Sequence, residues 1–139
     1  MGRVLAVDPG EKRLGLAISD PTGTIANPCG VLKHVGRVVD AATIAALARD
    51  QGAERIVVGV ALDEEGEAGP AARHAQRLAE AIALQTNLPV ELWDESNSTC
   101  EAQAARRALG VRRDRRRGHL DDLAATVILQ GYLDAHSQK

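Results

Sequence analysis

The stretch "LAVDPGEKRLGLAISD", Leu5 to Asp20, contains two short apolar runs that flank a turn-forming segment. The runs cover residues 3–8 and 14–19 and are separated by Pro-Gly-Glu-Lys-Arg. Gly and Pro between two strand-like runs are typical of a β-hairpin, so we predict one here. Asp8 closes the first run. This position suits either a turn-initiating residue or a carboxylate held at the edge of a sheet.

The rest of the chain predicts alternating strands and helices. A weaker apolar run at residues 24–33 is interrupted by Pro28 and Gly30, which suits an edge strand. After it, the sequence predicts a helix at 38–49, a strand at 55–62, a helix at 70–86 and a strand at 90–93. Two further helices are predicted, one from residue 98 onward and one at 120–135. The three leading strands can form an antiparallel meander, and the later strand–helix–strand units add parallel strands. We therefore predict an α/β fold with a mixed sheet flanked by helices.

The composition indicates which class of protein this is and excludes several others. With 139 residues, of which 45% are apolar and 26% charged, the chain predicts one globular domain over residues 1–139. Trp93 and Tyr132 are its only aromatic residues, which argues against a stacking platform for single-stranded nucleic acid. Cys29 and Cys100 are too few for a disulfide framework or a zinc site. Because the sequence shows neither a membrane span nor a signal-peptide pattern, we predict a cytoplasmic protein without membrane contact.

Acidic residues stand at the ends of two predicted strands. Asp8 lies near the carboxyl end of the first strand, and Asp94 and Glu95 follow the last one. If those two strands neighbour one another, with the strand at 55–62 close by, both acidic positions lie on the same rim of the sheet. That rim is where open α/β sheets bind their ligands.

The last predicted helix adds a third acidic position. At 100° per residue, Asp121 falls in line with the apolar positions Ala125, Ile128 and Tyr132, whereas Asp122 lies about 100° away on the flank. An acid in line with a buried stripe is costly unless it is paired or bound to a metal. Asp121 is therefore the stronger candidate of the two.

Each acid also has a purely structural interpretation. Asp8 can initiate a turn, and Asp94, Glu95, Asp121 and Asp122 can complement helix dipoles. Their joint arrangement favours a site, because carboxylates gathered around one point repel one another unless a cation is present. Hard oxygen ligands suit Mg²⁺ or Mn²⁺, and two such ions about 3.5–4 Å apart support phosphodiester hydrolysis.

A basic segment precedes the last helix. Residues 106–117 contain seven arginines and one acid, in a chain whose net charge is −2. Such a run is typical either of a solvated loop or of a surface that holds phosphates, since the guanidinium fork matches phosphate oxygens. The predicted phosphate-binding residues are Arg112, Arg113, Arg115, Arg116 and Arg117, with Lys12 and Arg13 from the first turn.

Over nearly its whole length the chain resembles the YqgF family, also called RuvX, of RNase H-like proteins. The stretches that carry the resemblance are "LAVDPGEKRLGLAISD", "IVVGVALDEEGEAGP", "WDESNST" and "LDDLAATVILQGYL". The resemblance implies a five-stranded mixed sheet, a three-stranded antiparallel meander plus two parallel strands, with helices on both faces. The family is similar to Holliday junction resolvases and is also assigned to 5′-end maturation of small-subunit ribosomal RNA precursors. Its acidic triad falls here on Asp8, Glu95 and Asp121.

The chain departs from the family pattern at three places. Val60 and Ala61 stand where a Leu-Pro pair is usual, and His119 stands where a basic residue is common. After the Asp-Glu pair the family usually has Arg and Leu, whereas this chain has Ser96 and Asn97. The missing arginine removes a phosphate or structural contact, while the acidic triad is retained.

These features predict a divalent-metal-dependent nuclease acting on structured nucleic acid, either branched DNA or precursor ribosomal RNA. Asp8, Glu95 and Asp121 would hold Mg²⁺ or Mn²⁺, with Asp94 and Asp122 as helpers. A symmetric four-way junction would require a homodimer with two matched sites. Two alternatives stay open: a catalytically weak nucleic-acid-binding module of ribosome assembly, and a phosphate-binding domain of the actin or sugar-kinase kind.

Overall fold

The computed structural model describes residues 2–10, 12–60, 69–94 and 119–136, with the side chains of the last segment described from residue 123 onward. The strands are β1 (Val4–Pro9), β2 (Arg13–Ser19), β3 (Ala26–Lys33), β4 (Arg55–Val60) and β5 (Val90–Asp94). The helices are α1 (Arg37–Asp50), α2 (Pro70–Gln85) and α4 (His119–His136). The helix predicted from residue 98 lies outside the described residues. None of the described helices combines the length and hydropathy needed to cross a membrane.

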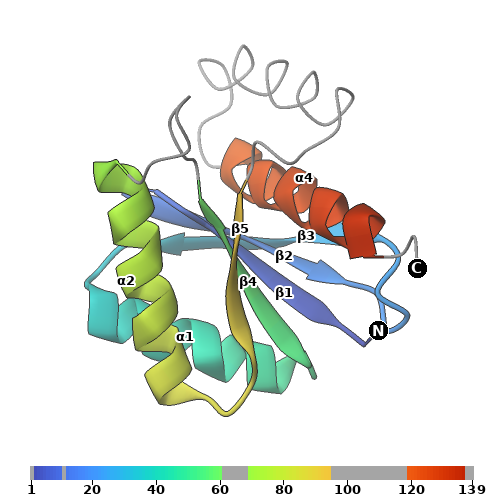
Figure 1. The fold of residues 1–139 in the computed structure, drawn as a ribbon, viewed down its shortest axis with the longest axis horizontal. Helices are drawn as coiled ribbons and strands as arrows, with labels where there is room; N and C mark the ends of the chain where they lie inside the picture. The colour runs from blue at the N-terminus through green and yellow to red at the C-terminus, as the bar shows by residue number, and fades with distance from the viewer. Residues whose placement is uncertain (1, 11, 61–68, 95–118, 137–139) are drawn as a thin grey trace.

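The five strands form one mixed sheet in the order β3-β2-β1-β4-β5 (Figure 1). β1, β2 and β3 pair antiparallel, and β4 and β5 continue the sheet parallel to β1. The predicted hairpin, meander and parallel additions are therefore confirmed. The strand that carries Asp8 does not neighbour the last strand, because β4 lies between them. Asp8 and Asp94 therefore do not lie on adjacent strands.

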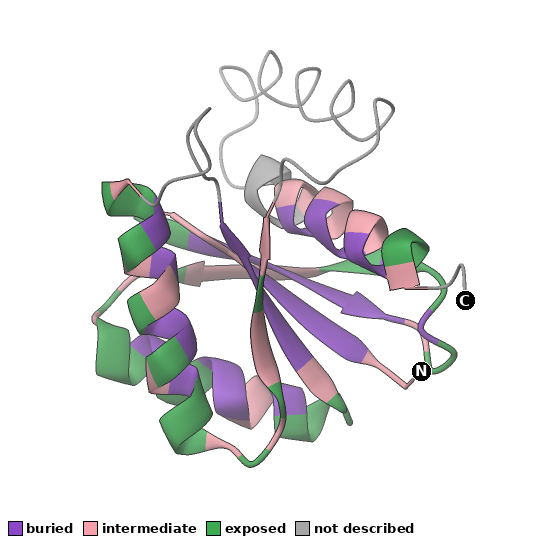
Figure 2. Cartoon of the chain, in the orientation of Figure 1, coloured by how far each residue is buried: buried purple, intermediate pink, exposed green. Residues whose placement is uncertain are grey.

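Helices cover the two faces of the sheet separately (Figure 2). On β1, Leu5 and Val7 belong to the apolar cluster that includes residues of α1 and α2. Val4 and Ala6 belong to the cluster that includes residues of α4. Successive side chains of a strand point to opposite faces, so a strand that is apolar throughout is covered on both sides. The sequence of β1 thus requires helices on both faces of the sheet.

β3 is the edge strand that its broken apolar pattern predicts. Its pairing with β2 shifts between Leu16, which faces Gly30, and Ala17, which faces Pro28. Cys29 is therefore the extra residue of a β-bulge. Gly30 has a φ of 112°, a backbone conformation that residues with a Cβ rarely adopt. Pro28 is tolerated because an edge strand has one side without a partner.

Asp20 organises the loop between β2 and β3. Its carboxylate accepts hydrogen bonds from the backbone N–H groups of Thr24 and Ile25, both at 2.8 Å, and from the N–H of Thr22 at 3.2 Å. The hydroxyl of Thr22 donates a further hydrogen bond to it. The bonds from Ile25 and Thr22 hold the pKa of this carboxyl well below its usual value of 3.8. The ionised form therefore stabilises the loop.

This loop predicts a pH-dependent stability difference. Since the pKa of Asp20 is lower in the folded than in the unfolded chain, its contribution is complete above about pH 4 and declines at lower pH. Asp20→Ala is expected to lower the melting temperature at pH 7, and the gap to wild type should be smaller at pH 3. Thermal unfolding of both proteins at pH steps from 7 to 3 measures that gap. A gap that stays constant over this range would contradict the assignment.

Candidate active site

The parallel strands direct their carboxyl ends to one edge of the sheet, which we call the carboxyl edge. Asp8 is half-buried near the end of β1. Figure 1 shows α4 beginning at the carboxyl edge and running toward the opposite one. Its later part is anchored near the amino ends of β4 and β5, where Tyr132 accepts a 2.6 Å hydrogen bond from Arg55 and donates one to Glu91. The first turn of α4 and Asp8 therefore share an edge.

Asp8 also lies on the α4 face of the sheet. It continues the row of Val4 and Ala6, which pack against α4. On the neighbouring strand, Val57 belongs to the same cluster, and the next residue of its row is Gly59. Because glycine has no side chain, β4 has no side chain next to Asp8 in this row on the α4 face.

Asp94 lies on the other face. Along β5, Val90 packs against the cluster of α1 and α2, whereas Trp93 packs against that of α4. Alternation places Asp94 in the row of Val90. Two strand spacings of about 4.8 Å separate β1 from β5, so the backbones at Asp8 and Asp94 are about 10 Å apart. The structure therefore does not bring Asp94 together with Asp8, and Glu95 lies outside the described residues.

The buried stripe of α4 is wider than its sequence predicts. Its buried members are Ala125, Ile128, Leu129, Tyr132 and Leu133. The helical repeat puts position 121 in line with Ile128 and position 122 in line with Leu129. Positions 121 and 122 are therefore both aligned with buried residues of α4, and the side chains of Asp121 and Asp122 lie outside the described part of the chain. This alignment does not favour one of the two acids over the other as a site residue.

The turn between β1 and β2 carries two basic residues at the edge of the sheet near Asp8. A Cβ on Gly10 would lie 2.3 Å from the carbonyl oxygen of Arg13, so this tight turn requires glycine. The backbone N–H of His34 donates a 2.9 Å hydrogen bond to the carbonyl of Lys12. Lys12 and Arg13 are both exposed there, at the carboxyl edge. The predicted phosphate-binding arginines at 112–117 lie outside the described residues.

The metal-ligand prediction depends on segments beyond the described residues. Within residues 2–10, 12–60, 69–94 and 123–136, no three His, Cys, Asp or Glu side chains come together in a group that could hold a metal ion. Of the predicted set of Asp8, Glu95 and Asp121, only Asp8 has a described side chain. The described part therefore contributes one carboxylate to the candidate site.

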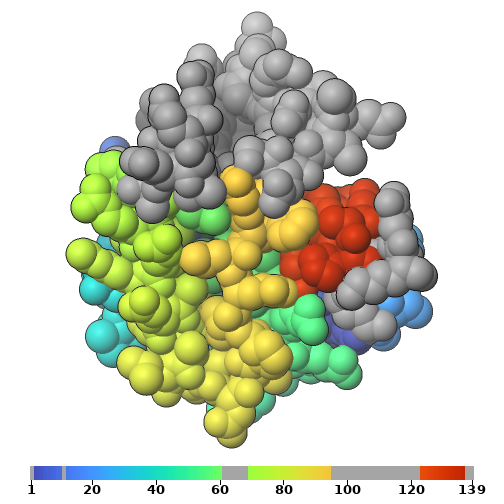
Figure 3. All heavy atoms as spheres, in the orientation of Figure 1, coloured from blue at the N-terminus to red at the C-terminus, as the bar shows by residue number. Residues whose placement is uncertain are grey.

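A network that the sequence analysis missed anchors α4. Burial, and then the hydrogen bond to Glu91, raise the pKa of the Tyr132 hydroxyl. Arg55 also lies 3.3 Å from the Glu91 carboxylate. The rings of Trp93 and Tyr132 are perpendicular, with centroids 5.3 Å apart. Figure 3 shows β5 at the surface between α2 and α4, so this network ties α4 to the exposed edge of the sheet.

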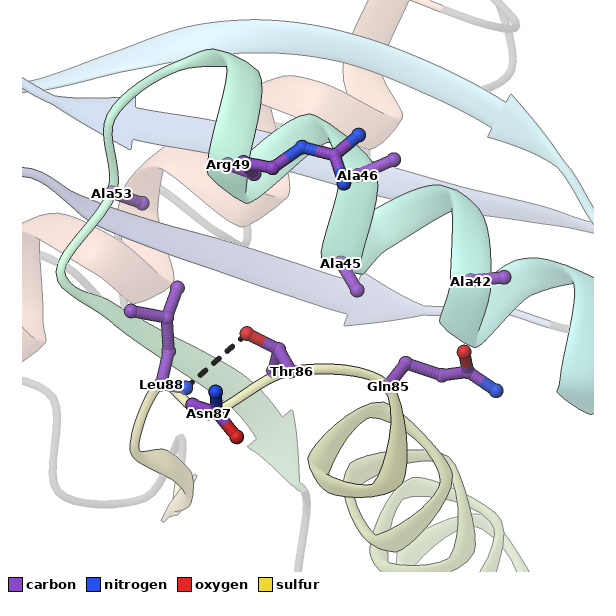
Figure 4. Close-up of a pocket in the computed structure, with 9 residues that line it drawn as sticks. All are labelled: Ala42, Ala45, Ala46, Arg49, Ala53, Gln85, Thr86, Asn87 and Leu88. Atoms are coloured by element: carbon purple, nitrogen blue, oxygen red, sulfur yellow. Dashed lines mark hydrogen bonds between the residues drawn. The ribbon is translucent and has the colours of Figure 1, made fainter.

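A separate cavity of about 520 Å³ lies at the opposite edge, between the ends of α1 and α2 (Figure 4). Four alanines contribute to its lining, and its polar lining residues are Arg49, Gln85, Thr86 and Asn87. Arg49 lies 3.7 Å from Asp50 and is mostly exposed. Among the described residues, no carboxylate lines this cavity, which is remote from Asp8. Arg49, which lines it, and the adjacent Asp50 provide controls for experiments on the carboxyl edge.

A family model described as Holliday junction resolvase, RuvX, matches residues 2–135. The chain belongs to the RuvX family. A relative from Anaeromyxobacter sp. (strain Fw109-5), named as a candidate pre-16S rRNA nuclease, is 43% identical over 95% of this chain and 96% of its own length. A relative with the same name from Acidiphilium cryptum is 40% identical over 95% of this chain and 84% of its own.

Solved structures support the same fold for this RuvX-family chain. RuvC from T. thermophilus, in complex with a Holliday junction substrate, matches with a TM-score of 0.63 and 18% identity, covering 99% of this chain and 97% of that one. The fowlpox virus Holliday junction resolvase matches with a TM-score of 0.53 and 16% identity, covering 96% and 99%. At these identities the likeness shows the fold, and the predicted RNase H-like sheet is confirmed.

Proposed function

We propose that this RuvX-family chain is a divalent-metal-dependent nuclease that hydrolyses phosphodiester bonds in structured nucleic acid. The observation that carries the proposal is the placement of Asp8. It is the penultimate residue of the central strand of the sheet, on the face that α4 covers and at the edge where α4 begins. Family membership and relatives named for nuclease activity support this interpretation.

The donor set fits a hard divalent cation. Asp8, Glu95 and Asp121 would hold Mg²⁺ or Mn²⁺ through carboxylate oxygens, the ligands that these ions prefer. When bound, the metal supplies an activated water and stabilises the leaving oxygen. We propose Asp122 as the helper in this set, since Asp94 lies on the opposite face of the sheet.

Two substrate classes follow from the comparisons. Relatives are named for a ribosomal RNA precursor, and the RuvC structure holds a four-way junction. We propose structured nucleic acid as their shared class. Cleavage of a four-way junction would further require two matched sites in a homodimer.

A panel of substrates tests the proposal. Purified protein is incubated with a four-way DNA junction, linear duplex DNA, single strands and a fragment of precursor 16S rRNA, each with Mg²⁺, Mn²⁺ or EDTA. Cleavage of a structured substrate is expected with metal only, and the preferred substrate identifies the pathway. Binding without cleavage under every metal, equal for wild type and Asp8→Asn, would overturn the nuclease and leave a binding module.

A further inference from the structure

We propose that three arginines on α1 and α2 form a second binding site for backbone phosphates, which holds a duplex arm of the nucleic acid. Arg37, Arg73 and Arg77 line one cavity of about 250 Å³ together with Pro70 and His74. We call these three residues the arginine cluster. This inference rests on the proposed function, because the ligand it assigns to the arginine cluster is the nucleic acid that the proposed nuclease cleaves. The cluster would hold that nucleic acid away from the cleaved bond.

Two helices bring the arginine cluster together. Arg73 and Arg77 are four residues apart on α2 and so project from the same side of that helix. Arg37 is the first residue of α1, which lies next to α2 on the same face of the sheet (Figure 1). The rings of His34 and His74 meet edge to face, with centroids 6.1 Å apart, and so connect the end of β3 to α2. The cluster is therefore built by tertiary packing.

The arginine cluster lies toward the carboxyl edge. β3 runs parallel to β1, since each pairs antiparallel with β2, so Lys33 at its end lies on the same edge as Asp8. α1 begins four residues after Lys33. Figure 1 shows the first turn of α2 at the same end of the molecule as the close of β4. Lys12 and Arg13, from the turn between β1 and β2, are exposed at the same edge of the sheet.

Among the described residues, the three arginines of the cluster form no ion pair. All three arginines are exposed, and none lies within 4.0 Å of an acidic oxygen among the residues described. Asp40, the nearest acid of α1, is buried and bonds instead to His34 at 2.5 Å and to the N–H of Val35 at 3.1 Å. Glu80 is the only acid in α2 and lies about one turn beyond Arg77.

Like charges gathered at one cavity repel one another, so their arrangement points to an anionic ligand. Guanidinium groups bind phosphate oxygens through paired hydrogen bonds, and contacts of this kind position a duplex without reading its sequence. Three such groups at one cavity match the phosphates of a duplex arm, whose backbone carries them in a closely spaced row.

Binding of a fluorescein-labelled four-way DNA junction without divalent metal tests this inference. The variant carries Arg73→Gln and Arg77→Gln, and the control carries Arg49→Gln at the opposite edge. Each phosphate contact contributes about 0.9 to the slope of log K against log salt concentration. The double variant is therefore expected to bind more weakly at 50 mM KCl and to have a slope shallower by about 1.8. The control should match wild type.

A second double variant separates charge from fold. Arg73→Lys with Arg77→Lys keeps both positive charges and is expected to retain the wild-type salt slope, while losing affinity with the paired hydrogen bonds. Equal melting temperatures establish that the variants are folded. A Gln variant whose affinity and slope equal those of Arg49→Gln would overturn the inference, even if Asp8-dependent cleavage persists. Because binding is measured without metal, failure of the nuclease proposal leaves this result interpretable.

Discussion

Asp8→Asn is expected to reduce metal-dependent cleavage at saturating substrate by a factor of about 10² to 10³, the loss typical when one preorganised group that stabilises charge is removed. The amide keeps the shape of the side chain but carries no charge to hold a divalent cation. Asp8 lies one residue before the end of the central strand and pairs in register with Gly15, so the change should leave the sheet intact. Single-turnover cleavage of the preferred substrate measures the effect.

Asp50→Asn is the matched control for that experiment. It makes the same chemical change at an exposed residue that ends α1 at the opposite edge of the sheet. Its cleavage rate should equal that of wild type. Cleavage by Asp8→Asn at the wild-type rate would show that this carboxylate serves only the turn. The activity would then have to come from other residues or from a contaminating nuclease.

Tyr132→Ala is expected to produce the largest loss of stability, about 3–5 kcal/mol in the free energy of unfolding. Tyr132 is fully buried and is the largest side chain in the core. Its removal leaves a cavity under α4, removes the perpendicular contact with Trp93 and leaves the Arg55–Glu91 pair without its hydroxyl partner. The expected loss is a large part of the 5–15 kcal/mol that stabilises typical domains. Urea unfolding followed by circular dichroism measures it.

Tyr132→Phe divides this loss into packing and hydrogen bonding. The ring stays, so we expect a cost of about 1–2 kcal/mol for the hydroxyl that bonds to two charged groups. If Tyr132→Ala and Tyr132→Phe cost the same, the ring would contribute nothing and the described packing of α4 would be contradicted. A loss of cleavage in Tyr132→Phe without a loss of stability would instead show that the network positions the start of α4.

The sequence determined those elements whose pattern is local. The Pro-Gly turn between two aliphatic runs specifies the β1–β2 hairpin, because Gly10 alone fits the space beside the Arg13 carbonyl. Pro28 and Gly30 mark β3 as an edge strand because they weaken pairing on one side. Helical spacing identified Ala125, Ile128 and Tyr132 in the buried stripe of α4. Asp8 became a candidate from its place near the end of a strand. All of these depend on residues close together in the chain.

Only the tertiary structure decided how distant segments meet. Sequence spacing did not show that β4 separates β1 from β5. The packing of β5, with Val90 against α1 and α2 and Trp93 against α4, places Asp94 on the face away from Asp8. Arg55 and Glu91 meet Tyr132 across β4, β5 and α4 because α4 crosses the sheet. Arg37 meets Arg73 and Arg77 although more than 30 residues separate them in the chain. Helix and strand periods repeat within a few residues, whereas these contacts depend on how whole elements pack.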